Sequence, residues 1–347
     1  LDEAVAEAMR QSPDVEAARA RARAASQGER SARAFQWPTV GLEAGAVRSN
    51  DPVAAFGGRL RQARFTQADF DPARLNHPDA LTDWSGALGV SWAPVDFSSL
   101  AGYDAAAREA EAAGLGAQWA TRAAGFRAEA RYVEAVAAER RMVAARATEE
   151  AARANLRVME RRQEEGILTE ADVLQARAVL SGAEARRIDA ERGVDDARDL
   201  LAVALGWPEG VVAVPSDTAF AAPDRSAGGP VEARADLRAS AAQVEAHGAR
   251  VRQARRARLP TLEGFARLET HSSRVFDDVQ DDWTVGFQLR VPLFTGFRID
   301  AQEKAAVAMR DAAAREHDQR LRKAQARLAE ARRGLRAATG RAEAARA

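Results

Sequence analysis

No cysteine occurs among the 347 residues, and its absence removes several classes of protein at once. A disulfide scaffold, a cysteine-ligated zinc or iron–sulfur site and a cysteine nucleophile are all excluded. The chain also lacks net charge, with 51 Lys and Arg against 51 Asp and Glu, which argues against a nucleic-acid binder that neutralises phosphates. Long hydrophobic runs are missing too, since Leu200–Leu205 falls far short of the roughly 20 apolar residues that a membrane-spanning helix needs.

Aromatic side chains are scarce, at 6% of the residues, although hydrophobic residues make up 46%, too many for a generically disordered chain. Alanine supplies much of that hydrophobic share, and Ala, Arg and Glu all favour helices. Helices lined with alanine pack closely but bury little area each. The composition therefore predicts long helices in extended contact. Helical patterns continue up to Leu1 and Ala347, so we interpret both ends of the chain as trimmed.

An internal repeat organises the chain. Residues 14–40 align without a gap with residues 236–262, and each copy is a helix that ends at a Pro-Thr pair, Pro38-Thr39 or Pro260-Thr261. Beyond each pair the hydrophobic period changes to two, and each copy contains a second alternating segment, which predicts four strands. Each strand runs for about 9–11 residues, the length of a tilted membrane β-strand.

The elements fall into two tandem copies of one pattern: helix, strand, strand and long helix. We place a first repeat at residues 1–205, a connector at 206–234 and a truncated second repeat at 235–347. The predicted elements are helix 1–36, strands 38–48 and 85–93, long helix 98–162, tip turn 163–169 and return helix 170–205, then helix 235–258, strands 261–271 and 283–291, and long helix 298–347.

A sharp turn separates the long helix of the first repeat from its return helix. We expect Thr169 to cap the return helix with Asp172 as its capping-box partner, and Gly166 to adopt a positive φ. A seven-residue spacing of apolar residues, which Arg187 interrupts, predicts coiled-coil packing; these residues are Val173, Leu180, Val194 and Leu201. An exposed apolar turn favours a docking surface formed by Gly166, Ile167, Leu168 and Thr169, with an ordinary helix hairpin as the alternative.

Each predicted strand has an apolar face and a polar face. The polar set, which either tunes the selectivity of a hydrated lumen or only keeps it wet, is Glu43, Glu263, Arg267, Glu269, Gln288 and Arg290. Phe265 is the exception on that face. Leu88, Val90, Val285 and Leu289 belong to the opposite face, which is expected to contact lipid. The lipid-facing and interfacial aromatic residues, which barrel girdles require, are Trp37, Trp84, Trp92, Trp283, Phe287 and Phe294.

No pattern points to catalysis, and we expect no enzyme, no metal and no cofactor, because phosphate loops, nucleophile elbows and His-Glu-x-x-His motifs are missing. His77, His247, His271 and His317 are scattered without ligand spacing and are interpreted as surface residues. The acidic run Asp277, Asp278, Asp281 and Asp282 could bind a cation, but a solvated loop cluster is favoured.

The connection at residues 49–83 is long for a loop. It either partly caps a channel mouth or is a variable loop without a role of its own.

Three features together resemble the TolC-type outer-membrane efflux proteins. They are the Pro-Thr strand entries, the strand exit VPLFTGFR at residues 291–298 and the tandem duplication. Residues 1–15 look like that family's N-terminal helix, and GILTEADVLQA at residues 166–176 is similar to its periplasmic tip turn. The resemblance covers essentially the whole chain, which departs from the family pattern in lacking the second tip, the last long helix and the C-terminal segment.

The resemblance implies an α+β membrane protein that assembles as a homotrimer. Four strands from each of three chains would form an outer-membrane β-barrel, and the helices would form a long periplasmic α-helical barrel. Independently, four strands cannot close a barrel alone, and an open sheet edge is not tolerated in lipid. The implied function is a passive exit channel of a Gram-negative tripartite efflux or type I secretion system, docked to a periplasmic adaptor (membrane fusion protein) and an inner-membrane pump. A periplasmic adaptor or soluble coiled-coil scaffold is the alternative, although it would not need barrel-length strands with aromatic ends.

Overall fold

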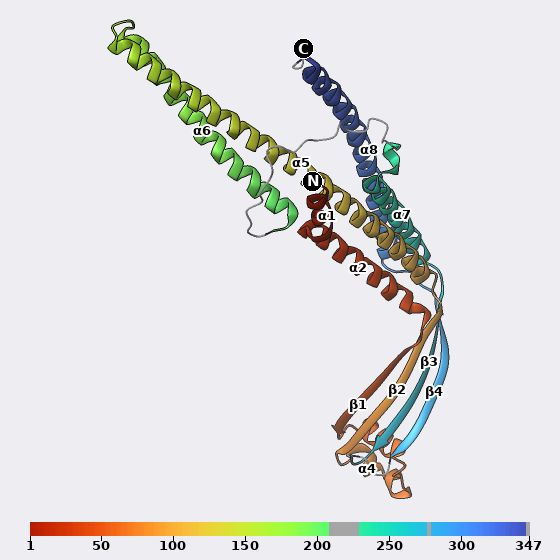
Figure 1. The fold of residues 1–347 in the computed structure, drawn as a ribbon. Coiled ribbons are helices and arrows are strands. Elements are labelled where there is room, and N and C mark those ends of the chain that lie inside the picture. The colour runs from red at the N-terminus through yellow and green to blue at the C-terminus, as the bar shows by residue number, and fades with distance from the viewer. Residues whose placement is uncertain (208–228, 276–278, 345–347) are drawn as a thin grey trace. The chain divides into compact units, whose positions relative to one another are not determined.

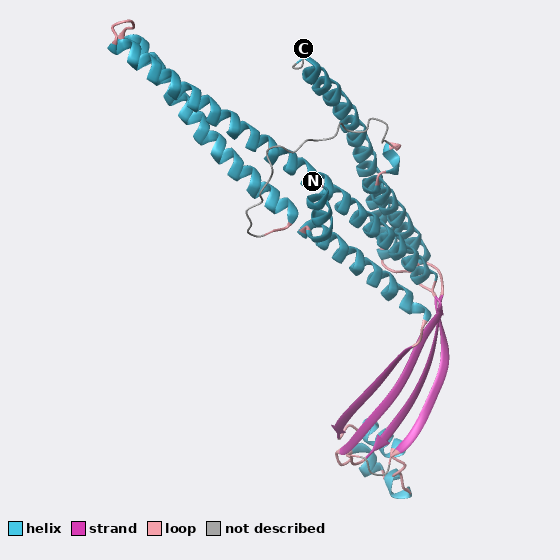
Figure 2. Ribbon diagram, viewed as in Figure 1, coloured by secondary structure: helices cyan, strands magenta, loops and turns pink. Residues whose placement is uncertain are grey.

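The computed structural model describes residues 1–207, 229–275 and 279–344, which form long helices and one four-stranded sheet (Figure 1; Figure 2). The chain divides into two compact units, each built from segments distant in sequence. The first comprises Leu1–Ala25, Glu111–Ala241 and His317–Ala347, and the second comprises Ser26–Ala110 and Ala242–Glu316. Within the described ranges, no helix has both the length and the apolar character that crossing a membrane requires.

The elements follow one another in the order that the repeat suggests. The α-helices are α1 Asp2–Gln11, α2 Pro13–Arg33, α3 Pro52–Arg61, α4 Pro72–Asn76, α5 Phe97–Glu164, α6 Glu170–Leu205, α7 Ala235–Arg256 and α8 Arg298–Ala344. The strands are β1 Thr39–Ser49, β2 Leu81–Val95, β3 Thr261–Ser272 and β4 Gln280–Arg290. Short 3-10 helices are η1 Ala34–Gln36, η2 Gln67–Phe70 and η3 Val231–Ala233.

The single helix predicted over residues 1–36 is wrong, because the structure has α1, α2 and η1 there. Ser12 lies between α1 and α2 with φ −56 and ψ 130, outside the helical region. Pro13 explains the break, since proline has no N–H to donate and disfavours helical geometry in the residue before it.

The connection predicted at residues 49–83 is also more ordered than the sequence suggested. Asp51 and Asp71 each cap a helix that has proline in its first turn, α3 and α4. The strand β2 begins at Leu81 rather than at residue 85, because its first residues pair with the far end of β1, where Ser49 lies opposite Leu81. Most of the predicted connector, residues 208–228, lies outside the described residues.

The strands form one antiparallel sheet in the order β1-β2-β3-β4. Phe265, the exception on the polar face, has a packing role there. Its ring covers its cross-strand partner Gly286, where an added Cβ would lie 2.7 Å from Phe265 Cζ. On the opposite face the roles are exchanged, since the ring of Phe287 lies 3.0 Å from where a Cβ of Gly264 would stand. Each glycine therefore makes room for an aromatic ring on the neighbouring strand.

Small side chains form the core of the first unit. Ala8 of α1, Ala128 and Val136 of α5, and Leu201 and Leu205 of α6 are fully buried and belong to one cluster. Alanine brings two helix backbones close together, so the unit reaches dense packing with little apolar area per residue. This agrees with the alanine-rich composition.

The helices α5 and α6 form a hairpin whose seam follows the predicted seven-residue spacing. Val173, Val194 and Leu201 are buried and Leu180 is half-buried, which confirms the predicted packing. Arg187 occupies the position that interrupts the spacing, and its Nε lies 2.6 Å from the carboxylate of Glu149 on α5. The interruption is thus an ion pair between the two helices.

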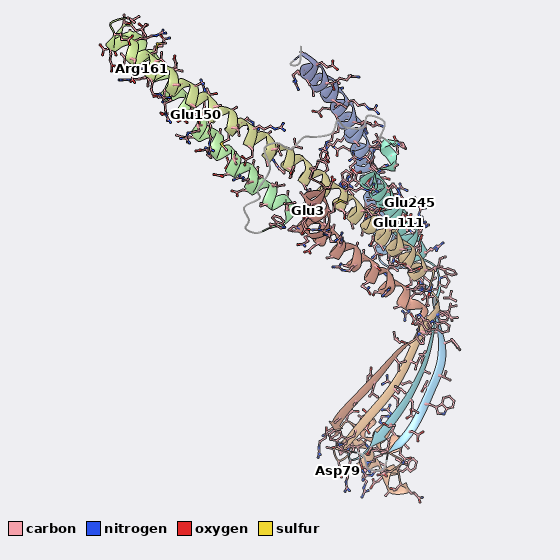
Figure 3. The ribbon with its side chains drawn as sticks, viewed as in Figure 1. Glu3, Asp79, Glu111, Glu150, Arg161 and Glu245 are labelled. Carbon is pink, nitrogen blue, oxygen red and sulfur yellow. The ribbon has the colours of Figure 1, made fainter. Side chains whose placement is uncertain are left out.

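A second ion pair joins the same helices. Arg198 of α6 donates from Nη2 to Oε1 of Glu139 on α5 at 2.5 Å. Glu139 and Glu149 are both buried, and a buried carboxylate needs a partner of opposite charge. These pairs therefore hold α6 at one position along α5. Other charged side chains project from the helices, as Figure 3 shows for Glu150 and Arg161.

In the second unit, arginines of α7 hold it against α5. Arg252 donates to Asp104 at 2.5 Å, and Arg250 lies 2.6 Å from Glu109. All four side chains are substantially solvent-accessible, so each pair contributes about 0–1 kcal/mol. Their role is to orient the helices more than to stabilise them.

Gly206 generates the first prediction. It ends α6 with φ 80 and ψ 20, and an added Cβ would lie 2.9 Å from the backbone oxygen of Gln11. A left-handed conformation costs a residue with a side chain about 1–2 kcal/mol. We therefore expect Gly206→Ala to lower the melting temperature of the helices, measured by circular dichroism on the protein in detergent.

Gly193→Ala is the matched control. Gly193 lies inside α6, and no atom stands within 4 Å of a Cβ added there. Replacing an interior helical glycine by alanine stabilises a helix by about 0.5–1 kcal/mol. The two variants should thus shift the melting temperature in opposite directions, and equal shifts would contradict the conformation at Gly206.

Candidate functional site

The strand register sorts the side chains of the sheet onto two faces. On one face Leu42, Leu88, Leu268 and Trp283 lie in a row across all four strands. The same face carries Val40, Val90, Trp92, Ala266, Val285, Phe287 and Leu289. Trp283 is 73% exposed and Phe287 75% exposed, so the described part of the chain leaves this face uncovered. An apolar surface of this kind indicates contact with a partner or with lipid.

The opposite face carries all six polar residues predicted for it, namely Glu43, Glu263, Arg267, Glu269, Gln288 and Arg290. Arg267 forms ion pairs with two carboxylates, at 3.1 Å from Oε2 of Glu43 and 2.5 Å from Oε1 of Glu269. Closer to the helices, Arg290 lies 3.2 Å from Glu263, which has Gln288 as its cross-strand partner. The register therefore divides the predicted set into two clusters.

Aromatic residues stand toward both ends of the sheet. Trp84 and Trp283 lie toward the end that carries α3 and α4, whereas Trp37, Trp92 and Phe294 lie toward the end where the long helices begin. The indole nitrogen of Trp92 donates to the backbone oxygen of the residue before Trp37 at 3.1 Å. This bond fixes the indole at the entry to the sheet.

The helix α3 folds back over the polar face at the far end of the sheet from the long helices. Gln62, which follows α3, is buried, and its side-chain amide donates to the backbone oxygen of Thr82 at 2.9 Å and to Oδ1 of Asp83 at 2.8 Å. Between α3 and the sheet lies a cavity of about 430 Å³, to which Ala54 and Arg61 contribute from α3. We call this space the rim cavity.

Charged residues of both signs line the rim cavity: Glu43, Asp83, Glu269, Arg61 and Arg267. His271 lies beside them and is only 5% exposed, so the prediction of a surface histidine is wrong here. The ring nitrogen Nδ1 lies 2.8 Å from Oδ2 of Asp83. His271 is buried because α3 and the residue that follows it, Gln62, cover this end of β3. The side-chain amide of Gln62 also donates to the backbone oxygen of the residue after His271. The sequence contained no signal that α3 would cover this strand end.

Strand pairing creates a group that the sequence analysis missed. Glu269, His271 and Asp282 each offer a potential metal-ligand atom, and these atoms lie within 4.8 Å of one another. Glu269 and Asp282 are direct cross-strand partners, while Asp281 is opposite Thr270 on the other face. Two further members of the predicted acidic run, residues 277 and 278, lie outside the described residues. The alternation of β3 already placed Glu269 and His271 on one face, but the partner strand supplied Asp282.

The tip turn joins α5 to α6 through a Schellman motif. The N–H of Ile167 bonds to the oxygen of Arg162 at 2.8 Å, and the N–H of Gly166 bonds to the oxygen of Gln163 at 2.9 Å. Gly166 has φ 76, which confirms the predicted positive φ. Ile167 is 66% exposed, as predicted, but Leu168 is half-buried, because successive side chains of a tight reversal point in different directions.

Comparison with family models matches residues 4–207 and 231–347 to the outer membrane efflux protein family. Among solved structures, the outer membrane protein VceC of Vibrio cholerae superposes with a TM-score of 0.81 at 23% identity, over 98% of this chain and 80% of that one. The CmeC outer membrane channel of Campylobacter jejuni gives 0.79 at 18% identity, over 93% and 67%. A membrane protein from Pseudomonas aeruginosa gives 0.79 at 20% identity, over 93% and 73%. At these identities the likeness shows the fold, and the search of curated proteins found no match.

The capping box at the start of α6 has a pH dependence that can be tested. The hydroxyl and the backbone N–H of Thr169 both donate to Asp172 and lower the pKa of its carboxyl below the ordinary 3.8. A lowered pKa means that the carboxylate stabilises the cap above its unfolded pKa and loses that effect as pH falls through the lowered value. We expect Asp172→Asn to speed amide hydrogen exchange in the first turn of α6 at pH 7.

The difference between Asp172→Asn and the unchanged protein should shrink as the pH falls from 3.8 through the lowered pKa, because the carboxyl of the unchanged protein becomes protonated over that range. Asp189→Asn, at an exposed position of the same helix, is the control and should alter exchange at neither pH. Equal effects of the two substitutions at pH 7, read by mass spectrometry of peptides that cover the tip, would contradict the cap.

Proposed function

We propose that this chain, which belongs to the outer membrane efflux protein family, is one subunit of a passive exit channel in the outer membrane of a Gram-negative bacterium. The observation that carries this proposal is the two-faced sheet. One face presents exposed apolar side chains along all four strands, and the other presents the charged clusters around Arg267 and Arg290. Such a sheet suits a barrel wall that separates lipid from a hydrated lumen.

The edges of the sheet support assembly with further copies. The outer strands β1 and β4 have no partner on their free edges within the described part of the chain. An unpaired edge is not tolerated in lipid, so the barrel must close through other subunits. A homotrimer closes it with 3 × 4 = 12 strands, and the resemblance to TolC-type proteins implies the same assembly. The helices of the three copies would then form the wall of a periplasmic α-helical barrel.

The two sheet faces acquire roles in this assembly. Two charged clusters would line the lumen: Glu43, Arg267 and Glu269 form one, and Glu263 and Arg290 form the other. Because both signs of charge are present, the lumen wall would be hydrated but would carry little net charge. Trp84 and Trp283 would lie at one membrane interface, with Trp37, Trp92 and Phe294 at the other. Because α3 packs on the polar face, it would narrow the outer mouth of the channel.

A duct of this kind does no chemistry, so transport requires partners. We propose docking to a periplasmic adaptor and through it to an inner-membrane pump, as part of a tripartite efflux or type I secretion system. The adaptor or coiled-coil scaffold alternative is disfavoured, because the strands, from 11 to 15 residues long, would leave their apolar face in water.

Charge on the proposed lipid face provides the direct test. Val285 lies near the middle of β4 on that face. An arginine at mid-membrane costs about 2–4 kcal/mol, so we expect Val285→Arg to reduce membrane insertion and trimer yield. The measurement is the trimer band of outer-membrane fractions on unheated gels.

Gln288→Arg is the matched control, because Gln288 belongs to the same strand but to the polar face, opposite Glu263. It introduces the same side chain where a carboxylate can pair with it, and trimer yield should remain normal. If Val285→Arg assembled as well as Gln288→Arg, the assignment of the faces would have to be abandoned.

The tip turn is the proposed adaptor surface, formed by Gly166, Ile167, Leu168 and Thr169. Ile167→Asp is the cleanest variant, because Ile167 is exposed, whereas Leu168 is half-buried and Gly166 needs its positive φ. We expect trimer formation and insertion to persist while export falls, since a carboxylate would be buried without a partner against the adaptor.

Export of a pump substrate and crosslinking to the adaptor would both be measured. Leu174→Asp is the control, because Leu174 is an exposed apolar residue of α6 beyond the turn. Normal export and crosslinking in Ile167→Asp would remove the turn from the proposed surface, and loss of the trimer would favour a turn that only holds the hairpin together.

A further inference from the structure

We infer that Glu269, His271 and Asp282 form a binding site for a divalent transition-metal cation of the Zn²⁺ type at the edge of the rim cavity. The three side chains come from two neighbouring strands, with Glu269 and His271 on β3 and Asp282 on β4. Their candidate ligand atoms all lie within 4.8 Å of one another, somewhat wider than the roughly 3.3 Å between two ligands of one tetrahedral Zn²⁺.

The two carboxylates stand in an arrangement that a bound cation would stabilise. Glu269 and Asp282 are directly opposite each other in the register, and like charges in that position destabilise a sheet. Arg267 compensates in part by binding Oε1 of Glu269, which leaves the second oxygen of that carboxylate for another partner. A bound cation would turn the remaining repulsion into attraction.

The buried histidine supplies an independent indication of a ligand. Its Nδ1 lies 2.8 Å from Oδ2 of Asp83, so that nitrogen carries the proton and donates it to the carboxylate. The other ring nitrogen, Nε2, is buried and has no hydrogen-bond partner among the described residues; in the neutral ring it is an acceptor. A buried acceptor left unpaired costs about 1–3 kcal/mol, and coordination to a metal removes that cost.

Asp83 has the position that an outer carboxylate holds in metal sites, where it orients the histidine and raises its basicity. It is itself held in place, because the side-chain amide of Gln62 donates to its other oxygen at 2.8 Å. His271 is therefore pre-oriented from α3 through Gln62 and Asp83. A cation bound at Nε2 would join His271 of β3 to Asp282 of β4, and so link both strands to Gln62 and Asp83.

The donor set decides the class of cation. One imidazole and two carboxylates match the mixed nitrogen and oxygen ligands of Zn²⁺ and of neighbouring first-row divalent ions. Ca²⁺ and Mg²⁺ prefer oxygen ligands alone and would gain little from His271. Glu269 and His271 line the cavity of about 430 Å³, which has room for the water molecules that complete the coordination.

Zn²⁺ binding to the purified full chain tests this inference. The protein in detergent would be stripped with a chelator, dialysed and titrated with ZnCl₂ by calorimetry. We expect one Zn²⁺ per chain, with affinity reduced at least about tenfold in His271→Gln and in Asp282→Asn. Asp83→Asn, which removes only the orienting carboxylate, should weaken binding by about 10- to 100-fold. The readout does not depend on export, so it is separate from the proposed function.

Asp281→Asn is the matched control, because it removes the same charge from the adjacent residue, which faces the other side of the sheet. It should bind Zn²⁺ as the unchanged protein does. Circular dichroism and the trimer band would establish that each variant folds. A second measurement needs no variant: Co²⁺ added to the unchanged protein should give visible d–d absorption that Zn²⁺ abolishes. Failure to bind Zn²⁺, unaltered binding in His271→Gln, or equal competition by Ca²⁺ would each overturn the assignment.

Discussion

Backbone pairing is the constraint on which the rest of this structure depends. In the proposed membrane location no water is present to satisfy an N–H or C=O group, so every such group of the sheet must bond to a neighbouring strand. This requirement accounts for long strands whose register is continuous except for a shift between β2 and β3 at Trp92 and Val95. Once the register is set, the alternation of side chains decides which residues share a face of the sheet. It places the row from Leu42 to Trp283 on the apolar face and the charged cluster around Arg267 on the polar face.

The helices are held together differently from the strands, because alanine lets two helices approach closely but buries little apolar area. Specific polar contacts then become important for the position of one helix along another. Arg187 and Arg198 of α6 meet the buried Glu149 and Glu139 of α5. Such pairs add little net stability, but a wrong alignment would leave a carboxylate buried without a partner. Specific polar contacts also fix positions at the rim cavity, where the side-chain amide of Gln62 donates to Asp83 and to the backbones of β2 and β3.

Much of this protein could be read from local patterns. Alternation showed the two faces of each strand, the tandem repeat and the tip motif pointed to the TolC-type fold, and the confirmed cap of Thr169 with Asp172 followed from residue types three positions apart. The positive φ of Gly166 was equally predictable, because so few other residues accept it. The sequence prediction fails at Pro13, which divides the helix expected there, and in residues 49–83, where short capped helices stand in place of a loop.

Properties that follow from the period, the caps and the repeat were thus determined by the sequence itself, since each depends on residues a few positions apart. The tertiary structure alone decided which distant residues meet. Glu269 faces Asp282 only because β3 and β4 pair in one register. His271 lies beside Asp83 because β2 pairs with β3, and it is buried because α3 returns to the sheet. No local pattern records such contacts, because they arise from strand pairing and from the packing of a helix on a sheet, which join segments far apart along the chain.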